Sequence, residues 1–128
     1  MSPVRTRLLD YLERRGYLNT PAVRAAMDSV DRAAFVPERQ KYAAWDDTPL
    51  PIGRGQTISA PHMVAMMLEE LQPRPGQRLL EVGCGVGTDL VRFARGGAHV
   101  TGVDLAEQSI ALAQSNFELH GLGGQADL

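Results

Sequence analysis

Apolar residues recur every three or four positions in five stretches of the chain, which is the spacing of amphipathic helices. The second stretch opens at Thr20-Pro21, a threonine N-cap followed by proline at the first helical position. The third opens around Ser59-Ala60-Pro61. The faces that we expect to be buried are Val4, Leu8, Tyr11 and Leu12 in the first helix, Val23, Ala26, Met27 and Val30 in the second, Val64, Met67, Leu68 and Leu71 in the third, Leu90, Val91, Phe93 and Ala94 in the fourth, and Ile110, Ala113 and Phe117 in the fifth.

Two shorter apolar runs, residues 79–82 and 100–103, have the length and composition of strands. They alternate with the last two helices, so the sequence predicts an α/β fold with a parallel sheet, preceded by up to three helices. Residues 31–60 show no regular period and contain several prolines and glycines. Because this segment also holds large apolar side chains, we predict an ordered loop that covers another part of the protein or a ligand, not a disordered linker.

Composition narrows the range of partners. A chain of 128 residues with 44% hydrophobic content can build one small core, and a net charge of −2 gives no reason to expect nucleic acid or an acidic membrane surface as a partner. No apolar run is as long as a membrane span, and the N-terminal residues do not form a signal-peptide core. The single cysteine cannot form an internal disulfide, which suits the cytoplasm. No histidine stands at a metal-ligand spacing, so we expect no metal site.

A glycine-rich turn follows the first strand, in the sequence Glu81-Val82-Gly83-Cys84-Gly85-Val86-Gly87. Asp104 follows about 20 residues later, at the end of the second strand, where a carboxylate meets a ribose hydroxyl in nucleotide-binding β-α-β units. The dinucleotide pattern G-x-G-x-x-G would need glycine at position 88, but Thr88 stands there. The turn instead resembles the first motif of S-adenosylmethionine-dependent methyltransferases of the Rossmann-like class. The resemblance implies that S-adenosylmethionine is the cofactor and that its contacts are Glu81, Gly83, Cys84, Gly85, Gly87, Asp104 and Leu105.

Cys84 allows two interpretations. A helix N-terminus can lower the pKa of a thiol, which would suit a catalytic nucleophile. Cys84 can also be a small residue that lines a ligand site. The second interpretation is favoured, because the sequence offers no partner histidine near it.

The segment that precedes the third helix is more specific. Residues 50–64 read LPIGRGQTISAPHMV, and residues 27–37 read MDSVDRAAFVP. Both resemble protein-L-isoaspartate O-methyltransferases, and the resemblance covers about residues 5 to 87. It implies a protein-repair enzyme, which methylates the α-carboxyl of isoaspartyl residues in damaged proteins or peptides to give an ester that collapses to a succinimide. It also implies that Ser59 is the catalytic or substrate-contact residue and that Gln56 and Thr57 contact the cofactor.

Ser59 has a structural alternative, because a serine just before Ala60-Pro61 is also a typical helix N-cap. Both roles are compatible at a helix end that faces a ligand. His62, three residues further on, is as well explained by helix structure as by a cofactor contact.

Beyond Gly87 the resemblance changes. Residues 88–95, 102–105 and 109–113 are more similar to small-molecule or quinone-type methyltransferases. The Rossmann-like class has a sheet of about seven strands, whereas residues 126–128 stand where a third strand would begin. We therefore expect a truncated fold with residues 1–76 as a helical and substrate-loop region and residues 77–128 as the first β-α-β-α part of the cofactor domain. The leading hypothesis is part of an isoaspartyl methyltransferase; the alternatives are a methyltransferase for a small-molecule acceptor and a non-catalytic S-adenosylmethionine-binding module. An incomplete sheet also leaves an edge that favours self-association.

Overall fold

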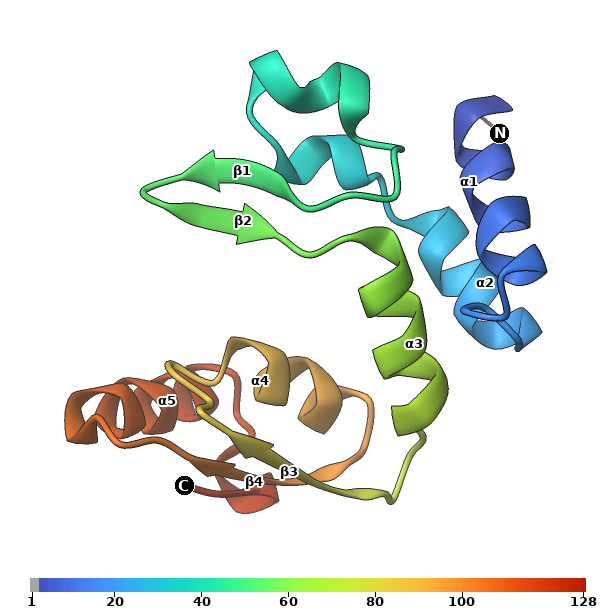
Figure 1. Cartoon of the computed structure of the whole chain (residues 1–128). Coiled ribbons are helices and arrows are strands. Elements are labelled where there is room, and N and C mark those ends of the chain that lie inside the picture. Colours follow the sequence, from blue (N-terminus) through green and yellow to red (C-terminus); the bar gives the residue numbers. More distant parts are fainter. Residues whose placement is uncertain (1–2) are drawn as a thin grey trace. The chain divides into compact units, whose positions relative to one another are not determined.

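A computed structural model describes residues 3–128, which form two compact units (Figure 1). The first unit ends at Gln72 and the second runs from Pro73 to Leu128. The sequence placed the boundary after Gly76, within the same connection between α3 and the first strand of the sheet. No helix in residues 3–128 is both long enough and apolar enough to cross a bilayer.

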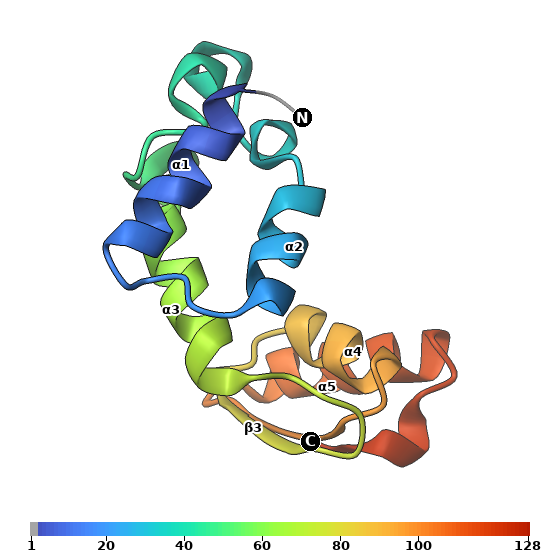
Figure 2. The ribbon, with the colours of Figure 1, turned by 90° about the vertical axis from the view of Figure 1, so that its right-hand side faces the viewer.

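The first unit combines three helices, two 3₁₀ turns and a hairpin (Figure 2). The elements are α1 (Pro3–Arg14), α2 (Pro21–Ser29), η1 (Arg32–Phe35), η2 (Glu38–Ala43), β1 (Leu50–Gly53), β2 (Gln56–Ile58) and α3 (Pro61–Leu71). One core cluster lies between the helices and consists of Leu8, Leu9, Leu12, Leu18, Val23 and Ala65. Thr20 caps α2 as predicted, since its hydroxyl accepts the N–H of Val23 at 3.3 Å.

The buried face of α3 differs from the predicted one. Pro61, Ala65 and Glu69, spaced four residues apart, are buried, whereas Met67 is 65% exposed. Glu69 explains the difference, because its carboxylate oxygen Oε1 accepts the backbone N–H groups of Asn19 and Thr20, both at 2.8 Å. These bonds turn the Glu69 face of α3 toward the start of α2. A prediction based only on apolar residues cannot identify a helix face that is buried because a carboxylate on it forms hydrogen bonds.

Residues 31–60 are ordered, as predicted, but they contain a hairpin that the sequence did not reveal. Strands β1 and β2 pair antiparallel, with Leu50 opposite Ile58 and Gly53 opposite Gln56. The turn residues Arg54 and Gly55 both have positive φ, at 50° and 71°. Positive φ at both central residues is the geometry of a tight two-residue hairpin turn. Arginine is uncommon there, and proline within β1 is unusual in a strand, so the local signal was weak.

The second unit is a three-stranded parallel sheet with two helices. Its elements are β3 (Arg78–Val82), α4 (Thr88–Arg95), β4 (His99–Val103), α5 (Glu107–Leu119), the 3₁₀ turn η3 (Gly123–Gln125) and β5 (Ala126–Asp127). The strand order is β3-β4-β5, and all pairs are parallel. The α/β prediction is therefore confirmed, including a third strand that begins at Ala126.

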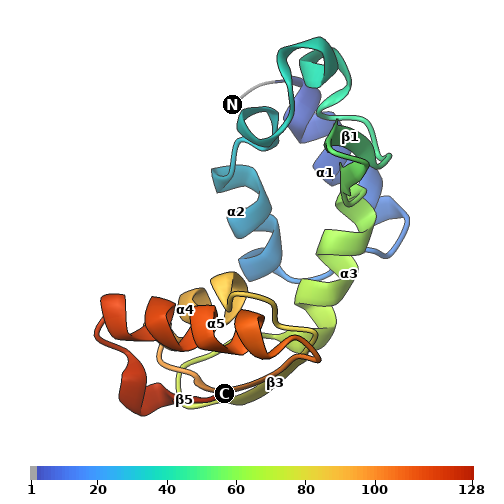
Figure 3. The ribbon, with the colours of Figure 1, turned by 90° about the vertical axis from the view of Figure 1, so that its left-hand side faces the viewer.

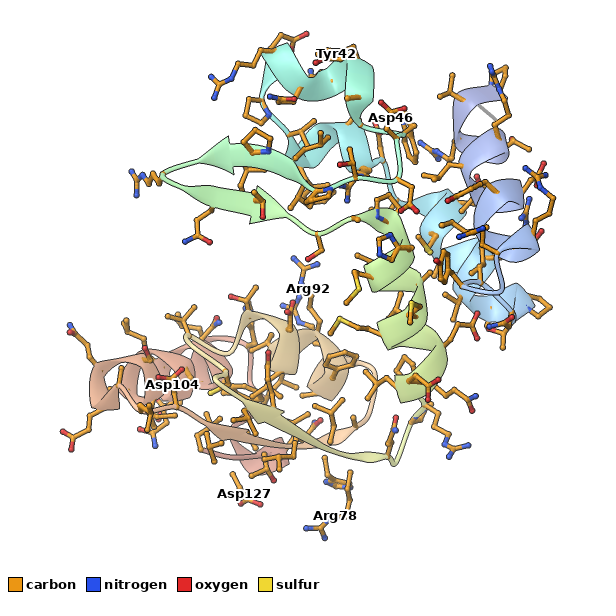
Figure 4. All side chains as sticks on the ribbon, in the orientation of Figure 1. Tyr42, Asp46, Arg78, Arg92, Asp104 and Asp127 are labelled. Carbon is orange, nitrogen blue, oxygen red and sulfur yellow. The ribbon has the colours of Figure 1, made fainter. Side chains whose placement is uncertain are left out.

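Helices α4 and α5 lie on the same side of this sheet (Figures 1 and 3). Residues that face them, such as Leu79 and Val100, are buried. The opposite face is open: Leu80 is 62% exposed and Val82 is 78% exposed. Figure 4 shows Arg78 and Asp127 pointing away from the helices on that open side.

Candidate functional site

The glycine-rich turn between β3 and α4 is built from backbone that other residues rarely adopt. Gly83, Gly85 and Gly87 have φ values of 77°, 54° and 71°. Glycine takes such values without steric cost. The N–H groups of Gly83 and Cys84 both donate to the carbonyl oxygen of Val103, at 2.7 and 3.1 Å, so the turn is fastened to the end of β4.

The three glycines serve different needs. A Cβ at Gly87 would lie 3.2 Å from the Ala113 side chain of α5, so this glycine also allows close packing of the turn against a helix. A Cβ at Gly83 or Gly85 would meet nothing within 4 Å. The space beside the backbone is therefore empty at these two positions, and a ligand can approach the backbone there.

Asp104 ties the turn to the start of α5. Its Oδ2 accepts the N–H of Gly85 at 2.9 Å, and its Oδ1 accepts the N–H of Ala106 at 2.8 Å. The hydrogen bonds from Ala106 and Gly85 hold the pKa of Asp104 below its ordinary value, so the carboxylate stays ionised. Each carboxylate oxygen has a second lone pair, so Asp104 can still accept hydroxyl groups of a ligand. Figure 4 shows Asp104 beside the N-terminal part of α5.

Glu81, two residues before the turn, carries a buried oxygen that has no partner. Its Oε2 is fully buried and, within residues 3–128, accepts no hydrogen bond. Burial raises the pKa of Glu81, and the charge of Asp89 raises it further. A buried oxygen without a hydrogen-bond partner destabilises the folded state, and a bound ion or ligand is a common explanation for such an atom. Glu81 therefore fits a site that takes a polar group of the cofactor.

The structure argues against the nucleophile interpretation of Cys84. Its side chain is buried, and its Sγ lies where a Cβ on Gly102 would reach within 2.9 Å. Burial raises the pKa of the thiol, and the charges of Asp104 and Glu81 act in the same direction. A lowered thiol pKa is therefore wrong for this cysteine. The Cys84 side chain is buried at the start of the turn, and its contact with the cofactor stays a prediction.

Two further residues complete the picture of the turn. Leu105, which follows Asp104, is fully exposed and offers apolar surface next to the carboxylate. Asn116, which the sequence did not single out, donates from Nδ2 to the carbonyl oxygen of Val86 at 3.2 Å. The sequence offers no signal for Asn116, because it is an exposed polar residue of a helix, 30 positions from Val86, and belongs to no recognisable motif.

Ser59, Gln56 and Thr57 belong to the first unit. Gln56 and Thr57 lie on β2, Ser59 follows it, and all three are exposed. The capping interpretation of Ser59 is wrong: the N-cap of α3 is Ala60, and no side chain at that position caps the helix. Within the described chain, the Ser59 hydroxyl takes part in no hydrogen bond. The N–H of His62 is bound instead by Oδ1 of Asp47, at 2.9 Å.

No three histidine, cysteine or acidic side chains in residues 3–128 come together as a metal-binding group.

Comparison with known proteins extends the resemblance over both units. The family model for protein-L-isoaspartate(D-aspartate) O-methyltransferase matches residues 4–123. The match thus includes residues 88–95, 102–105 and 109–113, whose sequence resembles small-molecule methyltransferases. A protein-L-isoaspartate O-methyltransferase of Korarchaeum cryptofilum is 56% identical over 126 residues, with 90% of this chain and 57% of the relative covered. That of Staphylothermus marinus is 42% identical over 125 residues, which cover 91% of this chain and 56% of the relative.

Solved structures agree with these relatives. A Plasmodium falciparum protein described as a protein-L-isoaspartate O-methyltransferase, crystallised with S-adenosyl-L-homocysteine, matches 90% of this chain and 55% of its own, with 31% identity and a TM-score of 0.55. A second structure under the name protein-L-isoaspartate O-methyltransferase covers 96% of this chain and 40% of its own, with a TM-score of 0.53; at 22% identity it supports the fold alone.

The chain spans between 34% and 57% of the length of the curated relatives that it matches. The family model nevertheless extends over nearly all of the residues of this chain, from the first helix to η3. The chain belongs to the protein-L-isoaspartate(D-aspartate) O-methyltransferase family.

Proposed function

We propose that this chain carries the cofactor-binding turn and the acceptor-binding serine of an enzyme that methylates isoaspartyl residues from S-adenosylmethionine. The observation that carries the proposal is the family match over residues 4–123, which includes both the Ser59 segment and the glycine-rich turn. The geometry of the turn supports the same conclusion, because its two open glycines, the ionised Asp104 and the unpaired oxygen of Glu81 suit a polar nucleoside ligand.

Each of these groups has a role toward the cofactor. The backbone at Gly83 and Gly85 lets the ligand come close, since no side chain intervenes. Asp104 uses its remaining lone pairs for the ribose hydroxyls. Glu81 accepts a hydrogen bond from the amino group of the methionine portion, and Leu105 offers its exposed side chain to the adenine ring.

Methyl transfer to a carboxylate requires few catalytic groups around the acceptor. When bound at the turn, S-adenosylmethionine would supply an electrophilic sulfonium methyl group; its transfer to a carboxylate oxygen would form the ester and leave S-adenosylhomocysteine. A carboxylate is already ionised at neutral pH, so no strong general base is required. The Ser59 hydroxyl holds the incoming carboxylate by donating a hydrogen bond, and the exposed Gln56 and Thr57 lie on the strand beside it. Catalysis then comes mainly from alignment and from exclusion of water.

The proposed partners are isoaspartyl-containing proteins or peptides. The free thiol of Cys84 is consistent with a reducing compartment such as the cytoplasm. We also propose self-association through the uncovered sheet face, where Leu80 and Val82 are exposed.

The central experiment offers the chain labelled S-adenosylmethionine and an isoaspartyl peptide. The matched control is the same peptide with normal aspartate at that position. We expect base-labile label on the isoaspartyl peptide alone. Binding of S-adenosylhomocysteine, measured in parallel by calorimetry, separates the alternatives: binding without transfer indicates a non-catalytic module, and equal labelling of both peptides contradicts the isoaspartyl acceptor.

Asp104 provides a test of the cofactor site that does not depend on turnover. We expect Asp104→Ala to weaken binding of S-adenosylhomocysteine several-fold, because it removes both a ligand acceptor and the two bonds that tie the turn to the start of α5. Asp127→Ala, at an exposed carboxylate of β5, is the matched control and should bind as the unmodified chain does. Equal affinity of the two variants would place the ligand elsewhere.

A further inference from the structure

Helix α3 starts without a cap of its own. Its N-cap is Ala60, which has no side-chain oxygen, and its first residue is Pro61, which has no N–H. The first backbone donor that needs a partner is therefore that of His62. Asp47 satisfies it from 15 positions away in the sequence: its Oδ1 accepts the His62 N–H at 2.9 Å. A carboxylate at a helix N-terminus is also favoured by the helix dipole.

Asp47 is held firmly in this place. The same oxygen lies 2.9 Å from Nδ1 of the His62 ring. The side chains of Asp47 and His62 are 15% and 31% exposed, so water screens the pair only in part. The ring of Tyr17 lies 5.3 Å from that of His62, and the Arg32 guanidinium donates to the carbonyl oxygen of Thr48, the residue after Asp47, at 3.3 Å. The loop between η2 and β1 is thereby connected to the first turn of α3.

This connection determines the path of the chain at Ser59. On one side, Ile58 is fixed by pairing with Leu50 in the hairpin. On the other side, Ala60 and Pro61 are buried, and the Asp47 bond follows at His62. Ser59 is thus a single exposed residue between two fixed points, and its hydroxyl forms no hydrogen bond within residues 3–128. The backbone that carries Ser59 is therefore pre-organised, and its hydroxyl is available to donate to a ligand.

We propose that Asp47 is a positioning residue for Ser59: by binding the start of α3, it fixes where the Ser59 hydroxyl is presented to the acceptor carboxylate. This inference rests on the proposed function for the role of Ser59. Asp47 itself need not touch either substrate.

The kinetic test compares Asp47→Ala with Asp47→Asn. The asparagine keeps an oxygen that accepts the His62 N–H, whereas the alanine removes it. We expect Asp47→Ala to raise KM for the isoaspartyl peptide about tenfold or more, since small misplacements of a contact group are costly, while KM for S-adenosylmethionine stays the same. Asp47→Asn should restore most of the loss. A variant that is merely less folded would lower kcat and leave both KM values unchanged.

Asp46 offers the matched control. Its side chain is exposed, it stands next to Asp47, and Figure 4 shows it on the loop between η2 and β1. Asp46→Ala should therefore leave both KM values as they are. An unchanged KM for the isoaspartyl peptide in Asp47→Ala would overturn the proposal.

A second arm works even if the chain transfers no methyl group. Amide hydrogen exchange at His62 and the backbone order parameter at Ser59 can be measured by NMR in the same variants. We expect Asp47→Ala to speed exchange at His62 and to lower the order parameter at Ser59, while Asp46→Ala changes neither. No change at Ser59 would refute the positioning role directly, whereas absence of methyl transfer from the unmodified chain would count against the proposed function alone.

Discussion

Gly102 stands where strand β4 comes closest to its neighbours in the second unit. A Cβ at this position would lie 2.6 Å from Cδ1 of Leu90, 2.7 Å from Cδ2 of Leu128 and 2.9 Å from Sγ of Cys84. Its φ is not positive, so the need for glycine is purely steric. We predict that Gly102→Ala destabilises the unit by about 1–3 kcal/mol through overpacking.

Urea denaturation, followed by circular dichroism, measures this effect as a lower midpoint. Gly123→Ala is the control, because a Cβ there meets nothing within 4 Å and the backbone is not left-handed. A midpoint for Gly102→Ala equal to that of Gly123→Ala would mean that Leu90 and Leu128 move aside at no cost.

Glu69 makes the stability of the first unit depend on pH. Burial alone would raise the pKa of its carboxyl, but the hydrogen bonds from Thr20 and Asn19 outweigh burial and lower the pKa. The folded-state pKa is thus below the unfolded value of about 4.3. The contribution of Glu69 to stability is therefore present above about pH 4.3 and lost as the pH falls through the folded-state pKa.

We predict that Glu69→Gln lowers the free energy of unfolding at pH 7 and flattens its fall in acid. Glu69→Ala should cost about 1.5–3 kcal/mol at pH 7, since it removes the charged acceptor of the part-buried Asn19 and Thr20 N–H groups. Chemical denaturation at pH 7 and pH 3 gives both quantities. Glu70→Gln, at the exposed neighbouring position, is the control and should keep the acid dependence of the unmodified chain.

At the scale of elements, the start of α3 lets a structural role of Ser59 be tested separately from a functional one. Because Ala60 is the N-cap and Asp47 binds the His62 N–H, Ser59→Ala should change stability by less than about 0.5 kcal/mol. We predict that it nevertheless reduces methyl transfer to an isoaspartyl peptide. Ser59→Asp should be worse, since its charge repels the incoming carboxylate.

Thermal unfolding and initial rates on the same preparations test this pair. A loss of stability of about 1 kcal/mol in Ser59→Ala, the usual cost of removing an N-cap, would revive the capping role. Turnover of Ser59→Asp equal to that of the unmodified chain would exclude Ser59 from substrate contact.

The elements themselves could be predicted where the pattern was strong. The five helices, the strands β3 and β4 and the start of β5 follow from periodicity and from the order of apolar runs. The hairpin β1–β2 did not, because an Arg-Gly turn and a proline in the strand are weak signals. The phase of α3 was missed at Met67, since the face toward α2 is decided by the carboxylate of Glu69.

The candidate site shows the same division. The glycine-rich turn and Asp104 could be predicted because their spacing is local and stereotyped. Asn116 and Asp47 could not, because each acts on backbone far away in the sequence, 30 and 15 positions respectively. Residues that hold the backbone of a site in place leave no local pattern, whereas the turns that they hold do.

For the molecule as a whole, the uncovered sheet face has the largest consequence. Parallel sheets are usually covered on both faces, yet Leu80, Val82 and Val103 are 62%, 78% and 45% exposed. We predict concentration-dependent self-association, measured by size-exclusion chromatography with light scattering. Val82→Lys should shift the chain toward monomer, whereas Leu119→Lys, at an 83% exposed position on α5, should not. A monomer at every concentration would contradict the prediction.

The bond between Asp104 and Gly85 has one more consequence, which concerns folding. It joins residues 19 positions apart that follow the paired strands β3 and β4, so it depends on that pairing. The site is therefore not formed in the unfolded chain, and a ligand of the turn binds only the native state. Binding energy then adds to folding energy, by about 2.7 kcal/mol when the ligand is present at 100 times its Kd. Depletion of such a ligand would therefore lower the free energy of unfolding of the second unit.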